Sequence, residues 1–216
     1  MPTGLFIVLE GIDGAGTTTQ ARLLVDWLQA AGRQVVLTAE PTHGPIGSTI
    51  RQILRGRLMQ SPAGKPLPVE EETMALLFAA DRADHLRNTV LPALEAGAIV
   101  VSDRHYLSSL AYQALGVDME WVASLNSRFR RPDLTVMLDV DPQVSLCRKQ
   151  AQGLAVERYE HLHFLDRVRA NYRKAAELAQ AAGERVTWLD GGASIAVVQE
   201  QVRRLVEPLV ASGVSP

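Results

Sequence analysis

Apolar residues occur along this chain in two kinds of pattern. Short continuous apolar runs are typical of strands buried on both faces, and apolar residues spaced three or four apart are typical of helices. The runs that predict strands lie at residues 5–9, 34–38, 98–101, 134–140 and 185–189. Helical spacing is clearest after Thr18, where Ala21, Leu24 and Leu28 share one face and Gly32 follows as a stop signal.

Two further segments complete the pattern. Residues 46–54 predict a short helix, and residues 69–94 predict a long, mostly helical stretch in which Pro92 permits a kink or a break. Strands that alternate with helices predict a parallel sheet with helices on both faces. We therefore expect an α/β protein with a three-layer α/β/α arrangement around a five-stranded parallel sheet. The chain length fits one domain, residues 1–216.

Composition narrows the classes of function. Hydrophobic residues make up 47% of the chain and charged residues 21%, which is typical of a globular protein with a sizeable core. The formal net charge of -2 gives no support for a nucleic acid as partner. The single cysteine, Cys147, excludes an intramolecular disulfide and a cysteine metal cluster. The first residues show no secretory signal, and no apolar stretch approaches the ~20 residues that span a bilayer, so we expect a cytoplasmic protein without membrane contact.

A glycine-rich segment lies between the first predicted strand and the first predicted helix. Gly11, Gly16 and Thr18 match the phosphate-binding P-loop pattern, but Thr17 occupies the position of its lysine. Glycines let the backbone direct its N–H groups into a concave anion site, and the helix start adds partial positive charge. The Thr18 hydroxyl is placed to bind Mg²⁺. Without the lysine, the motif alone is compatible with a phosphate site and with a structural turn.

Acidic residues follow two of the predicted strands, at the edge where ligands of open α/β sheets bind. Asp103, after the third strand, could reach Mg²⁺ or its waters, and Arg104 beside it could hold a phosphate through two parallel hydrogen bonds. A surface Asp–Arg pair is the alternative. Glu40 follows the second strand and could orient a hydroxyl or a metal-bound water, or belong to an ordinary turn with Pro41.

Phe78 and Arg82 lie four residues apart, so on a helix they share one face. An aromatic ring and a guanidinium on one face suit a planar base, because the ring can stack and the guanidinium can hydrogen-bond. The alternative places Phe78 in the core and pairs Arg82 with Asp81 or Asp84.

With these residues in view, the chain resembles the thymidylate kinase family from end to end. Four segments carry the resemblance, in matching order and spacing: LEGIDGAG at residues 9–16, EP at 40–41, LFAADR at 77–82 and DRHYLSSLAYQ at 103–113. The last segment is the most specific, because an Asp-Arg pair followed by Ser-Ser and Ala-Tyr-Gln is hard to match in other P-loop kinases. The resemblance implies a P-loop NTPase fold, Mg²⁺ as cofactor, a homodimer, and transfer of the ATP γ-phosphoryl group to dTMP to give dTDP and ADP.

The resemblance also implies roles for individual residues. Phe78 would stack on thymine, Arg82 would bond a thymine carbonyl, and Ser109 would lie near the ring N–H. Tyr112 would crowd the sugar C2′ and so disfavour ribonucleotides. The acceptor phosphate would be held by Arg104 together with Arg51.

The resemblance also assigns residues to ATP binding, dTMP binding, catalysis and metal binding. The ATP-binding loop would comprise Gly11, Ile12, Asp13, Gly14, Ala15, Gly16, Thr17, Thr18 and Thr19. The dTMP site would comprise Asp13, Glu40, Arg51, Phe78, Arg82, Arg104, Ser108, Ser109, Tyr112 and Gln113. The catalytic residues would be Asp13, Arg104 and Arg158, and the metal ligands Thr18 and Asp103.

Residues 148–160 resemble the lid of the family. Its charged residues here are Arg148, Lys149, Arg158 and Glu160. In one subgroup the phosphate loop lacks an arginine and the lid supplies the basic residue. The loop of this chain has no arginine after Asp13, so the chain matches that subgroup. A solvated helix face is the alternative interpretation of the segment.

Two positions depart from the family pattern. Thr17 stands where these kinases have lysine, and Ala39 stands where arginine precedes Glu40. Loss of one well-placed cation commonly costs about 3 kcal/mol of transition-state stabilisation, roughly a hundredfold in rate. We expect the lid arginines, Arg158 first, to cover the β- and γ-phosphates in its place.

Two alternatives to the kinase remain open from the sequence. Thr17 alone suggests a nucleotide-binding protein with weak or no kinase activity. A deoxynucleoside kinase would phosphorylate the sugar, and it would not need the two phosphate-binding arginines, Arg51 and Arg104. Dependence of binding on the phosphate of the acceptor would separate these possibilities.

Overall fold

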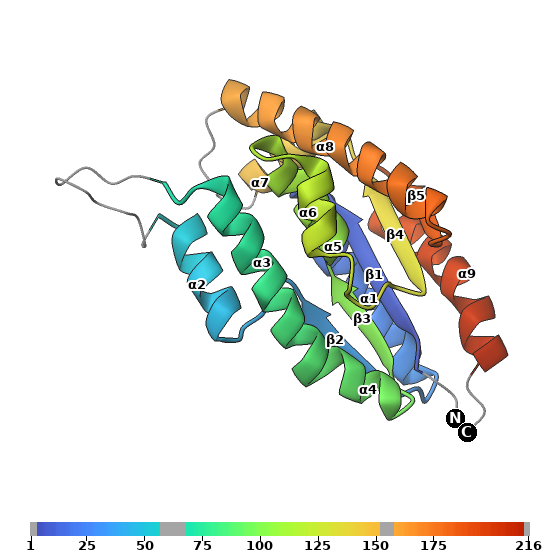
Figure 1. Ribbon diagram of the computed structural model, residues 1–216. Helices are drawn as coiled ribbons and strands as arrows, with labels where there is room; N and C mark the ends of the chain where they lie inside the picture. The colour runs from blue at the N-terminus through green and yellow to red at the C-terminus, as the bar shows by residue number, and fades with distance from the viewer. Residues whose placement is uncertain (1–3, 57–67, 152–157, 214–216) are drawn as a thin grey trace.

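The computed structural model describes residues 4–56, 68–151 and 158–213 of the chain, with the backbone alone at 158–161 and 212–213. A sheet of five parallel strands runs through the centre of the molecule (Figure 1). The strands are β1 (Phe6–Gly11), β2 (Val35–Ala39), β3 (Ile99–Asp103), β4 (Leu134–Asp139) and β5 (Val186–Asp190). Their order across the sheet is β2-β3-β1-β4-β5. The predicted five-stranded parallel sheet is confirmed.

Helices cover both faces of this sheet. The helices and helical turns are α1 (Thr17–Ala30), α2 (Pro45–Leu54), α3 (Glu71–His85), η2 (Leu86–Val90), α4 (Leu91–Glu95), α5 (Tyr106–Tyr112), η3 (Gln113–Leu115), α6 (Met119–Leu125), α7 (Pro142–Ala151), α8 (Arg158–Ala181) and α9 (Ile195–Gly213). Helices α1 and α9 lie behind the sheet in Figure 1, and α3, α5 and α8 lie in front of it. This is the three-layer arrangement that the sequence predicts. Within the described ranges, every helix lacks the length or the hydropathy needed to cross a membrane.

The long helical segment predicted at residues 69–94 changes pitch before Pro92. Helix α3 passes into the π-helical turn η2, and α4 follows with Pro92 as its second residue. Proline has no N–H, and its ring crowds the carbonyl four residues earlier, so a regular α-helix is disturbed there. A π-helical turn is one of the ways in which a helix absorbs such a disturbance. The kink or break that Pro92 permits therefore takes this form.

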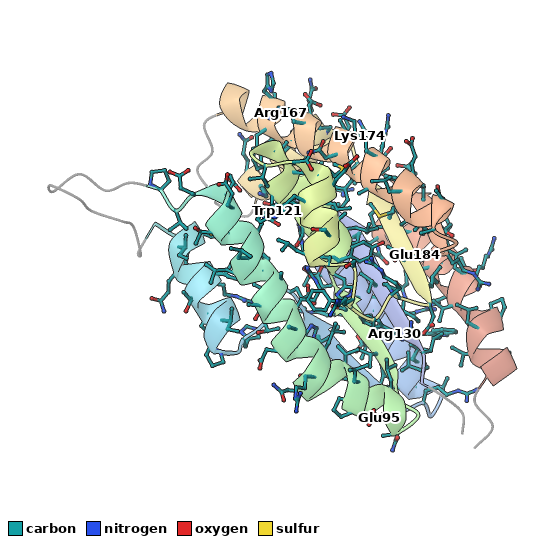
Figure 2. The ribbon with its side chains drawn as sticks, viewed as in Figure 1. Glu95, Trp121, Arg130, Arg167, Lys174 and Glu184 are labelled. Atoms are coloured by element: carbon teal, nitrogen blue, oxygen red, sulfur yellow. The ribbon has the colours of Figure 1, made fainter. Side chains whose placement is uncertain are left out.

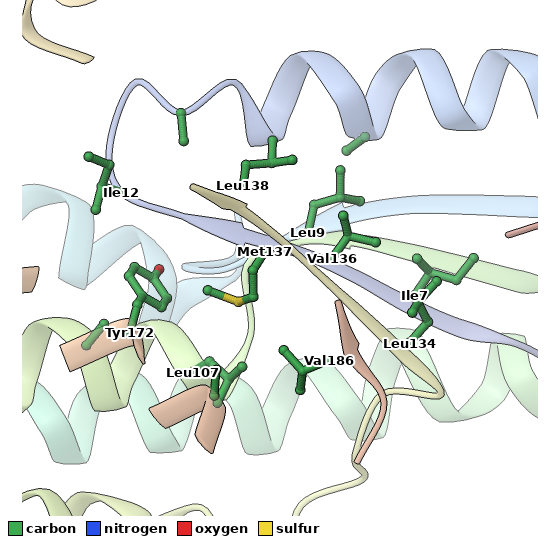
Figure 3. Close-up of a cluster of buried hydrophobic side chains, with 14 of the residues drawn as sticks. Ile7, Leu9, Ile12, Leu107, Leu134, Val136, Met137, Leu138, Tyr172 and Val186 are labelled. Atoms are coloured by element: carbon green, nitrogen blue, oxygen red, sulfur yellow. The ribbon is translucent and has the colours of Figure 1, made fainter. Parts of the chain in front are cut away.

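Side chains of β1 alternate between two hydrophobic clusters. Leu9 belongs to the larger cluster and points toward α1 in Figure 3, whereas Met137 of β4 points to the opposite side of the sheet. Phe6 and Val8 pack with residues of η2 and α4 in the smaller cluster. Because side chains alternate along a strand, Glu10 follows on the Phe6 and Val8 face. The strand thus carries a fully buried carboxyl group into the protein interior.

The carboxyl ends of the three neighbouring strands β1, β2 and β3 meet at one edge. In the register, Asp103 pairs with Leu9 of β1 and with Ala39 of β2. The N–H of Arg104 donates to the carbonyl of Leu9 at 2.9 Å, so the ladder extends one residue past β3. The segments that follow these strands are therefore brought together, and they carry most of the predicted site residues.

Candidate functional site

The glycine-rich loop connects β1 to α1. Gly14 and Gly16 have φ angles of 81° and 97°, which glycine adopts without the strain that a side chain would cause. A Cβ atom at Gly14 would lie 2.9 Å from Ser145 Oγ. Helix α1 begins at Thr17 without a side-chain cap, so its first N–H groups and the partial positive charge of its start can meet an anion. The loop has the backbone form of a phosphate site, although its Thr17 side chain is neutral and buried.

Thr18 and Asp103 meet where this loop faces the end of β3. The Thr18 hydroxyl donates a short hydrogen bond to Asp103 Oδ2. Asp103 Oδ1 is buried and has no hydrogen-bond partner in the described part of the chain. A hydroxyl beside a carboxylate with a spare oxygen fits Mg²⁺, which is usually held by one or two carboxylates together with water and phosphate. No group of three or more His, Cys, Asp or Glu side chains that could hold a metal ion occurs among the described residues.

Arg104 directs its guanidinium toward the glycine-rich loop. Its φ angle of 77° lies in the left-handed region, which is uncommon for a residue with a side chain. Nη2 lies 2.7 Å from Asp13 Oδ1, and the guanidinium carbon lies 5.0 Å from the centre of the Tyr112 ring. Backbone strain of this kind clusters at ligand-binding sites. The sequence-predicted residues Asp13, Arg104 and Tyr112 are therefore in contact with one another.

Two cations share the carboxylate of Asp13. Lys149 Nζ, from α7, lies 2.8 Å from Asp13 Oδ2, while Arg104 and the Tyr112 hydroxyl occupy Oδ1. Burial alone would raise the pKa of Asp13, but the charges of Arg104 and Lys149 outweigh it and hold the pKa well below its usual value. Asp13 is thus ionised and links the Arg104 guanidinium to the Lys149 ammonium group of α7.

Glu10 is a buried carboxyl group that the sequence did not single out as a site residue. Its Oε1 accepts from the N–H groups of His105 and Ser108 at 2.8 and 3.2 Å. Its Oε2 accepts from the hydroxyls of Ser108 and Tyr172 at 2.6 and 3.0 Å. Burial raises the pKa of Glu10 to about 7, although these hydrogen bonds and Arg104 oppose the shift. Arg104 Nη1 reaches the same two hydroxyls at 3.4 and 3.5 Å, so Glu10 positions Arg104 through them.

Glu40 lies in a second buried polar cluster, just after β2. Oε2 lies 2.7 Å from Arg82 Nη2, and Oε1 lies 3.0 Å from ring nitrogens of both His85 and His105. Burial would raise the pKa of Glu40, but the charges of Arg82 and His105 hold it well below its usual value. Glu40 thus uses both oxygens to hold basic side chains in place.

Arg82 connects this cluster to α5 and α6. Nη1 donates a short hydrogen bond to Asn126 Oδ1, and Nη2 donates to Ser109 Oγ at 3.1 Å. The sequence offered Asp81 as a partner for Arg82, but Asp81 instead accepts from the N–H and hydroxyl of Thr42 at 2.7 and 2.6 Å. The two predicted base-binding residues Arg82 and Ser109 are therefore brought together.

Three other predicted acceptor residues differ in their environments. Phe78 is half-buried on α3 and belongs to neither hydrophobic cluster of the described residues, which disfavours the core interpretation of its ring. Arg51 Nη1 donates to the carbonyls of Pro41 and Thr42 at 2.5 and 2.6 Å and so holds the loop after β2. Gln113 is buried in η3.

Helix α7 docks on the glycine-rich loop. Ser145 Oγ donates to the carbonyl of Asp13, and Arg148 Nη1 reaches the carbonyls of Gly14 and Ala15 at 3.5 and 3.4 Å. Arg148 Nη2 donates to the carbonyl after β5, that of Gly191, at 2.9 Å. A cavity of about 330 Å³ lies beside these contacts, and its lining includes Gln20, Ala193, Ile195 and Val198.

The predicted lid is described in part. Arg148 and Lys149 lie on α7 and contact the glycine-rich loop. Residues 152–157 lie outside the described residues, and so do the side chains of Arg158 and Glu160, although the backbone of α8 begins at Arg158. The predicted roles of Arg158 and Glu160 therefore stay predictions.

The sheet order, the glycine-rich loop between β1 and α1, and the carboxylate at the end of β3 beside that loop define a P-loop α/β protein. The family model described as thymidylate kinase matches residues 9–202. A "Probable thymidylate kinase" of Pyrococcus abyssi is 42% identical over 94% of this chain and 96% of its own length. A "Probable thymidylate kinase" of Thermococcus gammatolerans is 41% identical over 98% of this chain and 100% of its own. A "Thymidylate kinase" of Clavibacter sepedonicus is 39% identical over 99% of both chains. The chain belongs to the thymidylate kinase family.

Proposed function

We propose that this protein transfers the γ-phosphoryl group of ATP to dTMP, giving dTDP and ADP. The observation that carries the proposal is the contact of Arg104 Nη2 with Asp13 Oδ1 at 2.7 Å. Arg104 suits an anionic acceptor, and Asp13 belongs to the loop whose form suits the phosphates of a donor. A phosphate on Arg104 would therefore lie next to a nucleotide in the loop, as phosphoryl transfer requires.

In phosphoryl transfer the protein mainly positions the two nucleotides and stabilises the charge of the transition state. An oxygen of the dTMP phosphate forms a bond to the γ-phosphorus while the bond from that phosphorus to the β–γ bridging oxygen breaks, and ADP leaves. Arg104 would hold the attacking phosphate, with Arg51 as a second cation. Asp13 would stand between the two nucleotides and keep the cations around it oriented. Glu10 would keep Arg104 in position indirectly, because it accepts hydrogen bonds from the Ser108 and Tyr172 hydroxyls that Arg104 contacts.

On the acceptor side, Phe78 would stack on thymine, while Arg82 and Ser109 would bond its polar edge. The buried Glu40 supports this role, because it holds Arg82 in one orientation. Tyr112 would disfavour a ribose 2′-hydroxyl, and Ser108 and Gln113 would complete the acceptor site.

On the donor side, the loop from Gly11 to Thr19 would bind the phosphates of ATP, and the cavity beside Arg148 would take its base. Thr18 and Asp103 would hold Mg²⁺, which when bound neutralises charge on the β- and γ-phosphates. The orphaned Asp103 Oδ1 supports this assignment.

The test is incubation with ATP, Mg²⁺ and dTMP, with dTDP as the product to be detected. Arg104→Ala should lower kcat/KM for dTMP by roughly 10²–10³-fold, the usual effect of removing one well-placed charged donor. Arg87→Ala, at an exposed arginine of η2, should leave it unchanged. Phosphorylation of thymidine in place of dTMP would indicate a deoxynucleoside kinase. Binding of both nucleotides without turnover would indicate a nucleotide-binding protein that does not catalyse the transfer.

We also propose that the protein is a homodimer and acts in the cytoplasm. Leu76 on α3 and Leu54 on α2 are 52% and 64% exposed, and their helices pack together, so a second copy could cover them. Leu76→Glu should shift the mass measured by light scattering from dimer to monomer, whereas a monomeric wild type would refute the dimer. Cell fractionation tests the location.

A further inference from the structure

The glycine-rich loop carries no cation of its own. Residues 11–19 include neither lysine nor arginine, and Thr17 occupies the lysine position of the P-loop pattern. The Thr17 side chain is 6% exposed, and a Cβ atom at Gly11 would lie 3.5 Å from its Cγ2. Thr17 is therefore turned toward the end of β1, and its hydroxyl supplies no positive charge to a phosphate. A donor triphosphate in this loop needs a cation from another element.

Lys149 is placed to supply that cation. Its Nζ lies 2.8 Å from Asp13 Oδ2, inside the loop sequence, and its side chain is only 17% exposed. Ser145 and Arg148 lie four and one residues before it on α7 and also contact the loop, at the backbone carbonyls of Asp13, Gly14 and Ala15. One face of α7 is thus fixed against the loop by three side chains. The position of the Lys149 ammonium group is therefore fixed by the packing of α7 against the loop.

The two basic residues of α7 have different tasks. Arg148 donates to backbone carbonyls of the loop and of Gly191, so its guanidinium is used to hold two segments together. Lys149 has three N–H donors, and one of them meets Asp13. The others can meet phosphate oxygens without breaking that contact. Asp13 stays ionised beside it and keeps the ammonium group oriented.

We propose that Lys149 replaces the missing P-loop lysine and contacts the β- and γ-phosphates of the nucleoside triphosphate donor. This assignment rests on the proposed function, because it presupposes a triphosphate in the glycine-rich loop. It places the required charge on α7, at the start of the predicted lid, far from Thr17 in the sequence. It also differs from compensation by Arg158, which the sequence alone suggested.

The experiment compares Lys149→Met, Lys149→Arg and the double variant Thr17→Lys/Lys149→Met. Binding of ATP and of ADP is measured by calorimetry, and turnover of dTMP is measured in parallel. Lys149→Met should weaken ATP binding and lower kcat/KM for ATP by about 100-fold, with dTMP affinity retained. Thr17→Lys should restore most of this loss in the Lys149→Met background, and it should help more there than in the wild type, because the two positions supply one charge.

A matched control is Lys174→Met, at an exposed lysine of α8 (Figure 2). This variant should bind ATP like the wild type. A purely structural role for Lys149, pinning α7 to the loop, predicts a lower melting temperature and no rescue by Thr17→Lys. The proposal is overturned if Lys149→Met binds ATP like the wild type, or if neither Lys149→Arg nor Thr17→Lys recovers its loss. Failure of the wild type to phosphorylate dTMP would refute the proposed function instead, and the ATP-binding comparison would still decide the role of Lys149.

Discussion

Glu40 and Arg82 form an ion pair 2.7 Å long in which both side chains are almost fully buried, at 3% and 1% exposure. The pair joins the end of β2 to α3 and so holds in place the Arg82 side chain of the proposed acceptor site. Two histidines, His85 and His105, complete the shell around the Glu40 carboxylate. Buried charges are costly unless each finds its partner, so the cluster is sensitive to loss of any member.

Removal of Glu40 should destabilise the protein strongly. Glu40→Ala leaves the Arg82 guanidinium buried without its counter-charge, and we expect a loss of about 3–5 kcal/mol in the free energy of unfolding. Urea denaturation measures this loss. Glu200→Ala is the control, because its pair with Arg204 is largely exposed and should contribute no more than about 1 kcal/mol. Equal losses in the two variants would contradict the importance given to burial.

Glu10 should make stability depend on pH. Its pKa is raised from 4.5 to about 7 in the folded protein, so between these values the folded chain binds a proton that the unfolded chain releases. The wild type should therefore lose stability relative to Glu10→Gln as pH rises through this window, by about 3 kcal/mol in total. Glutamine fits, because its carbonyl oxygen can accept from the two backbone N–H groups while its amide faces the two hydroxyls.

Denaturation of both proteins at several pH values between 4 and 8 measures this difference. Parallel stability curves for the wild type and Glu10→Gln would show that Glu10 does not titrate in the window.

Phe78 should contribute to binding of the thymine ring and not of the phosphate. Phe78→Ala should weaken dTMP and thymidine binding alike, by roughly 1–3 kcal/mol, which is the usual worth of stacking a base on an aromatic ring. Phe78→Tyr should retain most of the affinity, because its ring is kept. Calorimetry with the two ligands measures this effect, and ADP affinity should stay the same in both variants. A loss confined to dTMP would place Phe78 near the phosphate instead.

Asp103 should govern the requirement for Mg²⁺. Asp103→Asn removes the charge beside Thr18, and we expect a fall in kcat of roughly a hundredfold and a higher Mg²⁺ concentration for half-maximal activity. Binding of ADP with and without Mg²⁺ gives a second readout, since only the Mg²⁺-dependent part should weaken. Asp26→Asn, at an exposed position of α1, is the control. An unchanged Mg²⁺ dependence in Asp103→Asn would exclude Asp103 as a ligand.

The strands that carry the candidate site could be predicted from the sequence because burial in a sheet restricts which residues a strand contains. Parallel strands covered on both faces are mostly apolar, so the buried strands β1, β3 and β4 appeared as apolar runs. The edge strands β2 and β5 are partly exposed, but enough apolar residues remain in them to indicate a strand. The residues that follow such strands meet at one edge. The contact of Thr18 with Asp103 and the approach of Arg104 to Asp13 follow from that rule together with the P-loop pattern.

Contacts between distant segments could not be predicted in this way. Tyr172 binds Glu10 across 162 positions, and Lys149 reaches Asp13 across 136. The only signal for Glu10 was an acidic residue directly after an apolar run that predicts a buried strand. The sequence placed Lys149 in the lid with two arginines, and nothing in the residue pattern could single it out. Its distance from the loop depends on how α7 packs, which is a property of the tertiary structure.

The register of β1 with β3 sets a fixed distance within the proposed site. Neighbouring strands in a sheet are held about 4.8 Å apart by their hydrogen bonds. The hydrogen bond from Arg104 N–H to the Leu9 carbonyl continues this ladder, so the backbone of Arg104 is held at the same distance from β1. The glycine-rich loop follows β1 directly. The distance between the glycine-rich loop and Arg104, the two proposed phosphate-binding elements, is therefore set by the sheet and does not depend on how the surrounding helices are placed.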